Sequence, residues 1–466
     1  MDTTAKRIVK VLILFCILLG SLVLYLSYFE IFVVAKIQDN PYNKRQWMRE
    51  EYVLRGSILD RNEKVLASSI KQDKQQIRNY PFKNLYSHVI GYSFKEYGKT
   101  AIEKNYNNQL LGIGNSPLTK VKDKIMGSDN MGNNVVLTID HTLQKNADEL
   151  LRGKKGSIVL MNPKTGEIYA MVSKPDFDPN TMRDDWQDII ENKESPLINR
   201  ATTGLYTPGS VFKMITATSV MENNSNQNYF CEGKTNIGGY VLKDYHSIAH
   251  GNVDLEKALI YSCNVAFSQM GIELGEEKLK STAQKYMFDK QIPFDIMSKK
   301  SIFSEEVKMT KTELGVSAIG QGKVLVTPLN MAMVASTIAN DGNMMKPFLV
   351  KEIINSKNRI IKMQPPKILS HVTNKENANK LRDIMIQVVE VGTGKKAKIK
   401  NVRVAGKTGT AENGSDKEHA WFIGFAPAND PKVAIAVVLE NEGKTGGTSA
   451  APIAREILKN ALNRVQ

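Results

Sequence analysis

Residues 207–216, Thr-Pro-Gly-Ser-Val-Phe-Lys-Met-Ile-Thr, decide how the rest of the chain is interpreted. Pro208 and Gly209 break the preceding segment, and the apolar residues after them predict a helix inside a domain. Ser210 and Lys213 stand three residues apart, so they share one helical face. A serine needs a base beside it to act as a nucleophile, and a desolvated lysine loses its proton readily. The stretch predicts a nucleophile with its base; the alternative is a helix cap followed by a lysine that reaches the surface.

The composition is that of a globular protein large enough for two or three domains. The formal net charge is +15, and the basic residues are scattered along the chain. We find no nucleic-acid-binding motif with interleaved aromatic residues. The charge favours proximity to an anionic membrane surface or an anionic polymer, and nucleic acid is not an expected partner.

A membrane anchor is predicted near the N-terminus. Residues 11–29 carry no charged side chain and are long enough to cross a bilayer as a helix. Basic residues before an apolar segment favour a cytoplasmic N-terminus. Three such residues precede this one, namely Lys6, Arg7 and Lys10.

A signal peptide cleaved near residues 33–35 is the alternative to an anchor. The apolar run exceeds the ~7–15 residues of a signal peptide's apolar region, so we favour an uncleaved anchor. We therefore expect a cytoplasmic tail at residues 1–10, a single-pass anchor at 11–34, and an extracytoplasmic chain from about Lys36.

The three cysteines do not form a disulfide framework. Cys16 lies in the apolar segment, while Cys231 and Cys263 could form one disulfide, although none is required. Cys263 is interpreted as a small packed residue. No pattern of His, Cys and Glu has the spacing of a known metal site, so no metal and no cofactor are expected.

The order of the predicted elements indicates the fold of the main domain. A strand and a helix come first, then a hairpin, a largely helical middle, three strands and an amphipathic helix. One antiparallel sheet, to which both ends of the domain contribute, accounts for this order, with helices packed on its faces. These elements are predicted at 134–139, 141–152, 157–161 with 168–172, 210–340, 402–410, 420–425, 433–439 and 451–465.

A more polar stretch precedes this domain. A short strand pair is predicted at 58–59 and 65–67, with a turn at 60–63, and helical spacing follows at 101–106. We interpret the stretch up to about residue 132 as a small module between the membrane and the main domain.

Two further motifs contain side chains that suit catalysis or binding. Ser262-Cys263-Asn264 offers a hydroxyl and an amide that point the same way if the backbone is extended. Lys407-Thr408-Gly409-Thr410 lies on a predicted strand and offers a cation, hydroxyls and a glycine that allows close approach of another backbone. This set suits an extended peptide with a terminal carboxylate, bound along a sheet edge. Each motif alone is weak, because caps and strand ends give the same patterns.

Together and in this order, the three motifs resemble those of class B penicillin-binding proteins, the monofunctional peptidoglycan D,D-transpeptidases. The resemblance extends from the anchor to the C-terminus. One departure is Glu63, which stands where the family often has glycine, so the turn geometry there is in question. The supporting signatures are Arg-Gly-Ser-Ile-Leu-Asp-Arg-Asn at 55–62, Asn-Arg-Ala at 199–201, Ile-Gly-Gln-Gly at 319–322, Thr-Pro-Leu at 327–329 and His-Ala-Trp-Phe-Ile-Gly at 419–424.

The resemblance implies an α+β architecture. Its main part is a penicillin-binding, β-lactamase-like transpeptidase domain, with a five-stranded antiparallel sheet flanked by helices, at residues 134–466. A pedestal module of the dimerisation type is implied at 35–133.

The resemblance also implies the role of each motif residue. Ser210 is the acylated nucleophile and Lys213 its base, Ser262 relays a proton to the leaving group, and Asn264 holds the substrate amide. The stem peptide's terminal carboxylate and backbone bind the strand motif, and the backbone N–H groups of Ser210 and Thr410 form the oxyanion hole. The strand motif consists of Lys407, Thr408, Gly409 and Thr410.

The implied reaction is acyl transfer from stem peptides that end in D-Ala-D-Ala, with release of the terminal D-Ala and acylation by β-lactams. The alternatives with the same fold are a β-lactamase-type hydrolase and a β-lactam sensor. We find no Glu-x-x-Leu-Asn between Ser262 and Lys407, which weakens the β-lactamase, and too few residues before Val11 for a signalling region. A further partner implied by the family is a SEDS-type glycosyltransferase, contacted through the anchor and the pedestal, with other cell-wall synthesis proteins.

Overall fold

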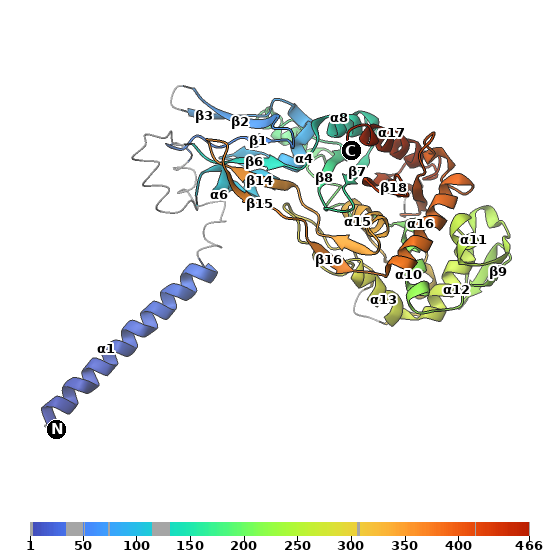
Figure 1. The fold of residues 1–466 in the computed structure, drawn as a ribbon, viewed down its shortest axis with the longest axis horizontal. Helices are drawn as coiled ribbons and strands as arrows, with labels where there is room; N and C mark the ends of the chain where they lie inside the picture. The colour runs from blue at the N-terminus through green and yellow to red at the C-terminus, as the bar shows by residue number, and fades with distance from the viewer. Residues whose placement is uncertain are drawn as a thin grey trace.

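The computed structural model describes residues 3–33, 50, 52–72, 75–113, 131–304, 308–414 and 416–465. The N-terminal segment forms the helix α1 (Thr3–Tyr28), which continues as a π-helical turn, η1 (Phe29–Val33). The helix is apolar enough and long enough to cross a membrane, and none of its residues is buried (Figure 1). It begins before the predicted anchor, since Lys6, Arg7 and Lys10 are also helical, and the predicted end at residue 34 lies outside the described residues.

A five-stranded sheet forms the centre of the main body, as the sequence predicts. Its order is β17-β18-β19-β7-β8, and every neighbouring pair is antiparallel. The last strand of the chain pairs with the first strand of the hairpin, so both ends of the domain contribute to the sheet. The strands are β7 (Gly156–Met161), β8 (Ile168–Lys174), β17 (Ala405–Ala411), β18 (His419–Ala426) and β19 (Val433–Leu439).

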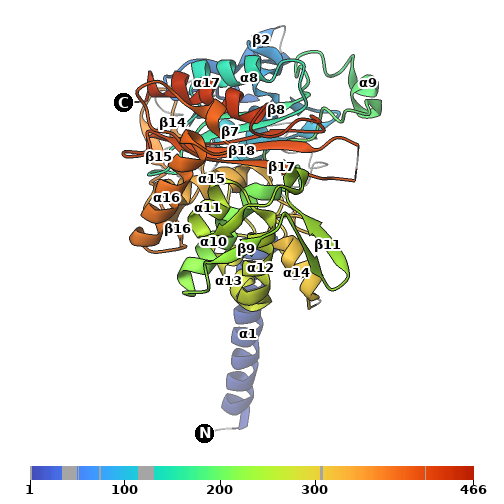
Figure 2. The same ribbon diagram turned by 90° about the vertical axis from the view of Figure 1, so that its right-hand side faces the viewer.

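Helices cover both faces of this sheet, in three layers that Figure 2 shows edge-on. On one face lie α8 (His141–Leu150) and α17 (Ala450–Leu462), close to the predicted helices at 141–152 and 451–465. On the other face lies α15 (Pro328–Ala339), every residue of which is buried. Alternate residues of a strand face opposite sides, which separates the core into two hydrophobic clusters, one on each face.

The region predicted as largely helical contains the expected helices and also four short strands. β9 (Tyr229–Cys231) pairs with β12 (Gly251–Val253), and β10 (Lys234–Ile237) pairs with β11 (Tyr240–Lys243). At three or four residues each, these strands are too short to show an alternating pattern. The helices of the region besides α15 are α10 (Lys213–Glu222), α11 (Leu255–Ile260), α12 (Asn264–Leu274), α13 (Glu276–Lys285) and α14 (Lys311–Ser317).

A second sheet of six strands forms the pedestal, in the order β15-β14-β6-β1-β2-β3. The predicted strand pair is present as β1 and β2, which are antiparallel, and β1 pairs in parallel with β6. The predicted division after residue 133 passes through this sheet, because β6, β14 and β15 come from the later part of the chain (Figure 1). The strands are β1 (Ile58–Leu59), β2 (Val65–Gln72), β3 (Gln75–Asn79), β6 (Asn134–Leu137), β14 (Val350–Ile354) and β15 (Ile360–Met363).

The turn between β1 and β2 forms although Glu63 stands at a position that suits glycine. Glu63 has a φ of 64°, in the left-handed region that costs a non-glycine residue about 1–2 kcal/mol. The Asp60 carboxylate accepts hydrogen bonds of 2.8 Å from the backbone N–H groups of Asn62 and Lys64, and thereby holds the turn.

A buried ionic cluster lies inside the pedestal. Glu103, which is fully buried, contacts the guanidinium groups of Arg55 at 2.6 Å and Arg78 at 2.7 Å. Burial raises the pKa of Glu103, but Arg55 and Arg78 together lower it by more, so that it lies below its usual value. The cluster joins the helix α5 (Ala101–Asn105) to β3 and to the segment that precedes β1.

The remaining elements are short, apart from α16. The helices are η2 (Lys83–Tyr86), α4 (Ser87–Ile90), α5 (Ala101–Asn105), α6 (Asn107–Leu110), α9 (Trp186–Glu191), η3 (Gly209–Phe212), η4 (Tyr245–Ser247), α16 (Lys375–Glu390) and η5 (Lys395–Ala397). The strands are β4 (Ser93–Phe94), β5 (Gly98–Lys99), β13 (Asn343–Met345) and β16 (Ile368–His371).

Candidate active site

Ser210 lies in the 3-10 turn η3, which leads directly into the buried helix α10. Gly209 in the same turn has a φ of 56°, and a Cβ there would lie 2.5 Å from the carbonyl oxygen of Thr410. Only glycine therefore allows the turn to pack this closely against strand β17. The indole of Trp421, on β18, donates a hydrogen bond of 3.0 Å to the carbonyl of Thr207. These contacts fix Ser210 beside the edge of the five-stranded sheet.

The amine of Lys213 is fully buried and faces Ser262 and Asn264. Its Nζ lies 2.6 Å from the carbonyl oxygen of Ser262, 3.3 Å from the Oγ of Ser262 and 2.7 Å from the Oδ1 of Asn264. Within the described residues, no hydrogen bond joins Lys213 to Ser210. The amine thus links the first motif to the second.

Ser262 lies at the corner between α11 and α12, so the extended backbone that would align the Ser262 and Asn264 side chains is not present. Its φ is 60°, Cys263 is the N-cap of α12, and Asn264 is the first residue of that helix. The side chains of Ser262 and Asn264 still converge on Lys213, because the corner folds back over α10.

The hydroxyl of Ser262 also contacts the third motif. The Nζ of Lys407, a fully buried residue on β17, lies 2.9 Å from the Oγ of Ser262 and 3.0 Å from the carbonyl oxygen of Thr408. One hydroxyl oxygen is therefore within hydrogen-bond distance of two lysine amines. The three motifs, which are far apart in the sequence, meet at this oxygen.

Two buried amines this close together cannot both be charged without a large cost. Burial lowers the pKa of Lys213 to about 8, although the Asp244 carboxylate opposes the shift. Burial, and then the charge of Lys213, lower the pKa of Lys407 well below its usual range. A neutral amine is therefore accessible near neutral pH, which is the requirement for a general base.

The side chains of the third motif face two directions: Lys407 is buried, whereas the two threonines face the cleft. Thr408 and Thr410 line a cleft of about 1160 Å³ that also contains Ser210, Ser262 and Asn264. The hydroxyl of Thr408 lies 2.6 Å from that of Thr393. β17 is an edge strand, so one of its sides is available to an extended ligand.

Gly409 packs away from the cleft wall. A Cβ there would lie 2.9 Å from the carbonyl oxygen of Pro208 and 3.1 Å from the Cβ of Trp421. The sequence predicts that this glycine allows close approach of another backbone, and in the structure that backbone is the turn before Ser210.

Asp244 is a residue of this site that sequence reasoning missed. It is buried, and one oxygen of its carboxylate accepts a hydrogen bond from the backbone N–H of Asn264. Its other oxygen lies 3.0 Å from the Sγ of Cys231 and 3.4 Å from that of Cys263. Nothing in the sequence marks it, because it lies twenty residues before Asn264 in a loop without a motif.

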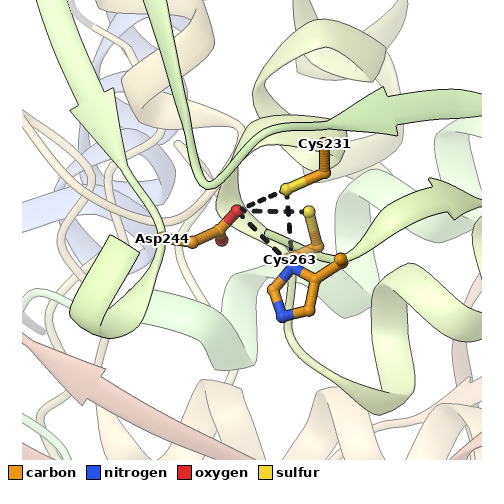
Figure 3. Close-up of side chains that lie close together, drawn as sticks. Cys231, Asp244 and Cys263 are labelled. Carbon is orange, nitrogen blue, oxygen red and sulfur yellow. Dashed lines mark hydrogen bonds and ion pairs between the residues drawn. The ribbon is translucent and has the colours of Figure 1, made fainter. Parts of the chain in front are cut away.

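Four side chains beside the cleft could hold a metal ion. They are Cys231, Asp244, His250 and Cys263, and their ligand atoms all lie within 4.8 Å of one another. Figure 3 shows the two thiols directed at the Asp244 carboxylate. Both cysteines are free, so the disulfide left open by the sequence is not formed. Burial and the neighbouring Asp244 raise the pKa of the Cys263 thiol.

The chain is similar to known proteins over nearly its whole length. Residues 156–459 match the penicillin binding protein transpeptidase domain, and residues 55–135 match the penicillin binding protein A dimerisation domain. The peptidoglycan D,D-transpeptidase PbpA of Mycolicibacterium smegmatis is 32% identical, with 99% of each chain covered. Stage V sporulation protein D of Bacillus subtilis is 31% identical over 84% of this chain and 64% of that protein.

Solved structures show the same similarity. Penicillin-binding protein A from M. tuberculosis, as its imipenem acyl-enzyme complex, superposes with a TM-score of 0.84 at 32% identity, over 89% of this chain and 100% of that chain. The D,D-transpeptidase domain of a protein from Eggerthella lenta gives a TM-score of 0.81 at 33% identity, over 88% of this chain and 99% of that chain.

The fold and the site define an active-site serine acyltransferase. The chain belongs to the class B penicillin-binding proteins, the monofunctional peptidoglycan D,D-transpeptidases.

Proposed function

We propose that this chain cross-links peptidoglycan stem peptides through an acyl-enzyme on Ser210. The observation that supports the proposal most directly is the contact of Lys213 and Lys407 with Ser262, and of Lys213 with Asn264, beside Ser210 in one cleft. A cluster of this kind supplies the nucleophile, the neutral amine and the hydroxyl relay that acyl transfer needs.

In the first step, the Oγ of Ser210 attacks the carbonyl carbon of the penultimate D-Ala. The O–C bond forms, the proton of Ser210 passes to Lys213, and the C–N bond to the terminal D-Ala breaks. Ser262 passes a proton to the departing amine, because its hydroxyl lies between the two lysine amines. The backbone N–H groups of Ser210 and Thr410 stabilise the oxyanion, and the close packing of Gly209 against Thr410 supports this pairing.

In the second step, an amine of a neighbouring stem attacks the ester carbonyl. The new C–N bond is the cross-link, and Ser210 regains its proton. Water in place of the amine would give D,D-carboxypeptidase activity. Asn264 holds the donor amide, while Lys407, Thr408, Gly409 and Thr410 bind its carboxylate and backbone along the open side of β17.

The test is intact-protein mass spectrometry of the full-length chain in detergent, over time, with benzylpenicillin. We expect a long-lived adduct of drug mass on the wild type and none on Ser210→Ala. An equally modified Ser210→Ala would exclude Ser210 as the nucleophile. A brief adduct with rapid turnover of the drug would support a β-lactamase-type hydrolase, and a persistent adduct without cross-linking of stem peptides would support a β-lactam sensor.

We also propose the arrangement in the cell. The tail at residues 1–10 is cytoplasmic, residues 11–34 are in the membrane, and residues 35–466, which form the pedestal and the transpeptidase domain, are extracytoplasmic. The apolar helix α1 and the basic residues at its start support this topology. A cysteine-accessibility assay with a membrane-impermeant thiol reagent, applied to intact cells, would place single introduced cysteines on one side or the other.

A SEDS-type glycosyltransferase is the proposed partner, and the pedestal is its proposed contact. Apolar side chains of β2 and β3 are exposed there, with Val65 at 42%, Ile70 at 53% and Ile77 at 44% of their surface. The double variant Ile70→Asp with Ile77→Asp should lose co-purification with the glycosyltransferase and keep its acylation by benzylpenicillin. Unchanged co-purification would exclude this contact.

A further inference from the structure

A cluster of two thiols, a carboxylate and an imidazole lies directly behind the cleft corner that carries Ser262. Cys231 ends β9, Asp244 follows β11, His250 precedes β12, and Cys263 caps α12. The pairing of β9 with β12 sets Cys231 opposite Gly251, and this register brings His250 to the cluster. Four places in the chain, at the ends of three strands and one helix, therefore each supply one potential ligand.

Of four separations between the ligand atoms, three lie in the range of a tetrahedral zinc site and one is shorter. The Oδ2 of Asp244 lies 3.0 Å from the Sγ of Cys231, 3.4 Å from the Sγ of Cys263 and 3.6 Å from the Nδ1 of His250. The Sγ of Cys231 lies 3.5 Å from the same nitrogen. Zinc bond lengths of about 2.0–2.3 Å place tetrahedral ligand atoms about 3.3–3.8 Å apart.

The surroundings suit thiolate ligands. The backbone N–H of Gly233 donates to the Sγ of Cys231 at 3.3 Å, and that of Ala266 donates to the Sγ of Cys263 at 3.4 Å. Hydrogen bonds of this kind stabilise sulfur ligands in metal sites. Cys231 and Cys263 are fully buried, whereas His250 lines the cleft and gives the cluster a route to solvent.

We propose that Cys231, Asp244, His250 and Cys263 bind one zinc ion. Two thiolates and one imidazole favour zinc over the hard cations calcium and magnesium. Binding displaces the two thiol protons, so Zn²⁺ enters as two H⁺ leave and the net charge of the cluster stays the same.

The ion would act as a clamp on the active-site corner. Cys263 lies between Ser262 and Asn264, and Asp244 holds the backbone N–H of Asn264. Ser262 itself adopts a left-handed conformation, which needs support from its surroundings. We therefore assign the zinc site a positioning role: it holds Ser262 and Asn264 against Lys213 and takes no part in the chemical steps.

The first test is the zinc content of the full-length chain, purified in detergent without chelator and measured by inductively coupled plasma mass spectrometry. We expect one zinc ion per chain, and a loss of more than tenfold in Cys231→Ser and in His250→Ala. Cys16→Ser is the matched control, because Cys16 is a free cysteine in α1, outside the cluster, and should leave the content unchanged.

The second test uses the wild type, because a variant that fails to fold would also lose zinc. Removal of the ion with a chelator should lower the melting temperature and slow acylation by benzylpenicillin at least tenfold. Added Zn²⁺ should restore both, and added Mg²⁺ neither. Substitution with Co²⁺ should give sulfur-to-cobalt charge-transfer absorption that Cys231→Ser lacks.

Two results would overturn the proposal. One is a reduced wild-type chain that takes up no zinc beyond the amount bound by Cys231→Ser. The other is a Cys231–Cys263 disulfide in the chain isolated without reductant. Metal content is read independently of activity, so a chain that binds zinc but is not acylated would contradict the proposed function alone.

Discussion

Ser262 is the residue on which the three motifs depend, because its hydroxyl is shared by the amines of Lys213 and Lys407. The hydroxyl reaches both amines because of the backbone conformation of Ser262, and that conformation has an energetic cost. The backbone is left-handed at a residue that is not glycine, and such strain persists where the surrounding structure holds it in place. Here the hydrogen bond between Asp244 and the N–H of Asn264, two residues further along, supplies that support.

The variant Ser262→Gly removes the hydroxyl and relieves the backbone strain, and the two effects can be measured separately. Glycine adopts this φ freely, so the free energy of unfolding should be unchanged or higher by up to about 1 kcal/mol. Acylation by benzylpenicillin should slow by about 10²–10⁴-fold, the usual contribution of a proton relay. Denaturant unfolding and adduct formation measure the two effects. Asn358→Gly, in an exposed turn with a φ of 56°, is the matched control and should keep full acylation. A normal acylation rate in Ser262→Gly would exclude the relay.

The pKa of Lys213 sets the pH dependence of acylation. Burial lowers this pKa to about 8, and only the neutral amine accepts a proton from Ser210. The rate of acylation by benzylpenicillin should therefore rise about tenfold per pH unit below about 8 and become constant above it. Mass spectrometry of the adduct at several pH values measures this profile, with unfolding followed at each pH as the control. A rate independent of pH between about 6 and 9.5 would contradict a lysine base.

The sequence predicted which residues form the site better than how they are arranged. The three motifs named the residues that meet at the cleft, because each is a fixed set of side chains at fixed spacing. The left-handed conformation of Ser262, and the amine of Lys213 bonded to Ser262 and not to Ser210, depend on a corner between two helices that no local pattern describes. Asp244 was missed for the same reason: its partners lie far along the chain.

At the scale of single elements, the pedestal is stabilised by the buried contacts of Glu103. This side chain joins α5 to Arg78 on β3 and to Arg55 before β1. Removing one partner of a buried ion cluster leaves uncompensated charges, which destabilises a protein by about 3–5 kcal/mol.

Glu103→Ala should therefore lower the free energy of unfolding by about 3–5 kcal/mol. The matched control is Glu96→Ala, which breaks the contact of 3.2 Å with Arg183 between two exposed side chains. Exposed pairs of this kind contribute about 0–1 kcal/mol. Equal destabilisation of the two variants in denaturant unfolding would show that the cluster does not stabilise the pedestal.

Most elements of the main body were predictable because their patterns are long and regular. β7, β8, β18 and β19 are runs of buried apolar residues, and α17 has one apolar face. The strands β9 to β12 were not predicted, since three or four residues carry too little pattern. The participation of β14 in the pedestal was not predicted either, because it pairs with β6, more than two hundred residues earlier in the chain.

At the scale of the whole molecule, the two sheets are not formed by two consecutive segments of the chain. β6 and β14 belong to the pedestal sheet, yet in the chain β6 precedes the first elements of the transpeptidase body and β14 follows most of its helices. The polypeptide thus leaves the pedestal after β6, builds most of the transpeptidase body, and returns to the pedestal at β14.

Unfolding of the two modules should therefore be one cooperative transition. Far-ultraviolet circular dichroism, which reports all helices and strands, and loss of benzylpenicillin acylation, which reports the cleft, should give the same melting temperature. Glu103→Ala should lower both midpoints together, although Glu103 lies in the pedestal. A pedestal that melts while acylation persists would contradict this coupling.

The shared pedestal sheet gives the enzyme a fixed height. Because β6 and β14 bind the body to the pedestal at two places far apart in the chain, the cleft cannot bend toward or away from the pedestal as a hinged arm would. The distance from the base of the pedestal to Ser210 is therefore fixed. We therefore expect the enzyme to cross-link glycan strands that lie at this distance from its base.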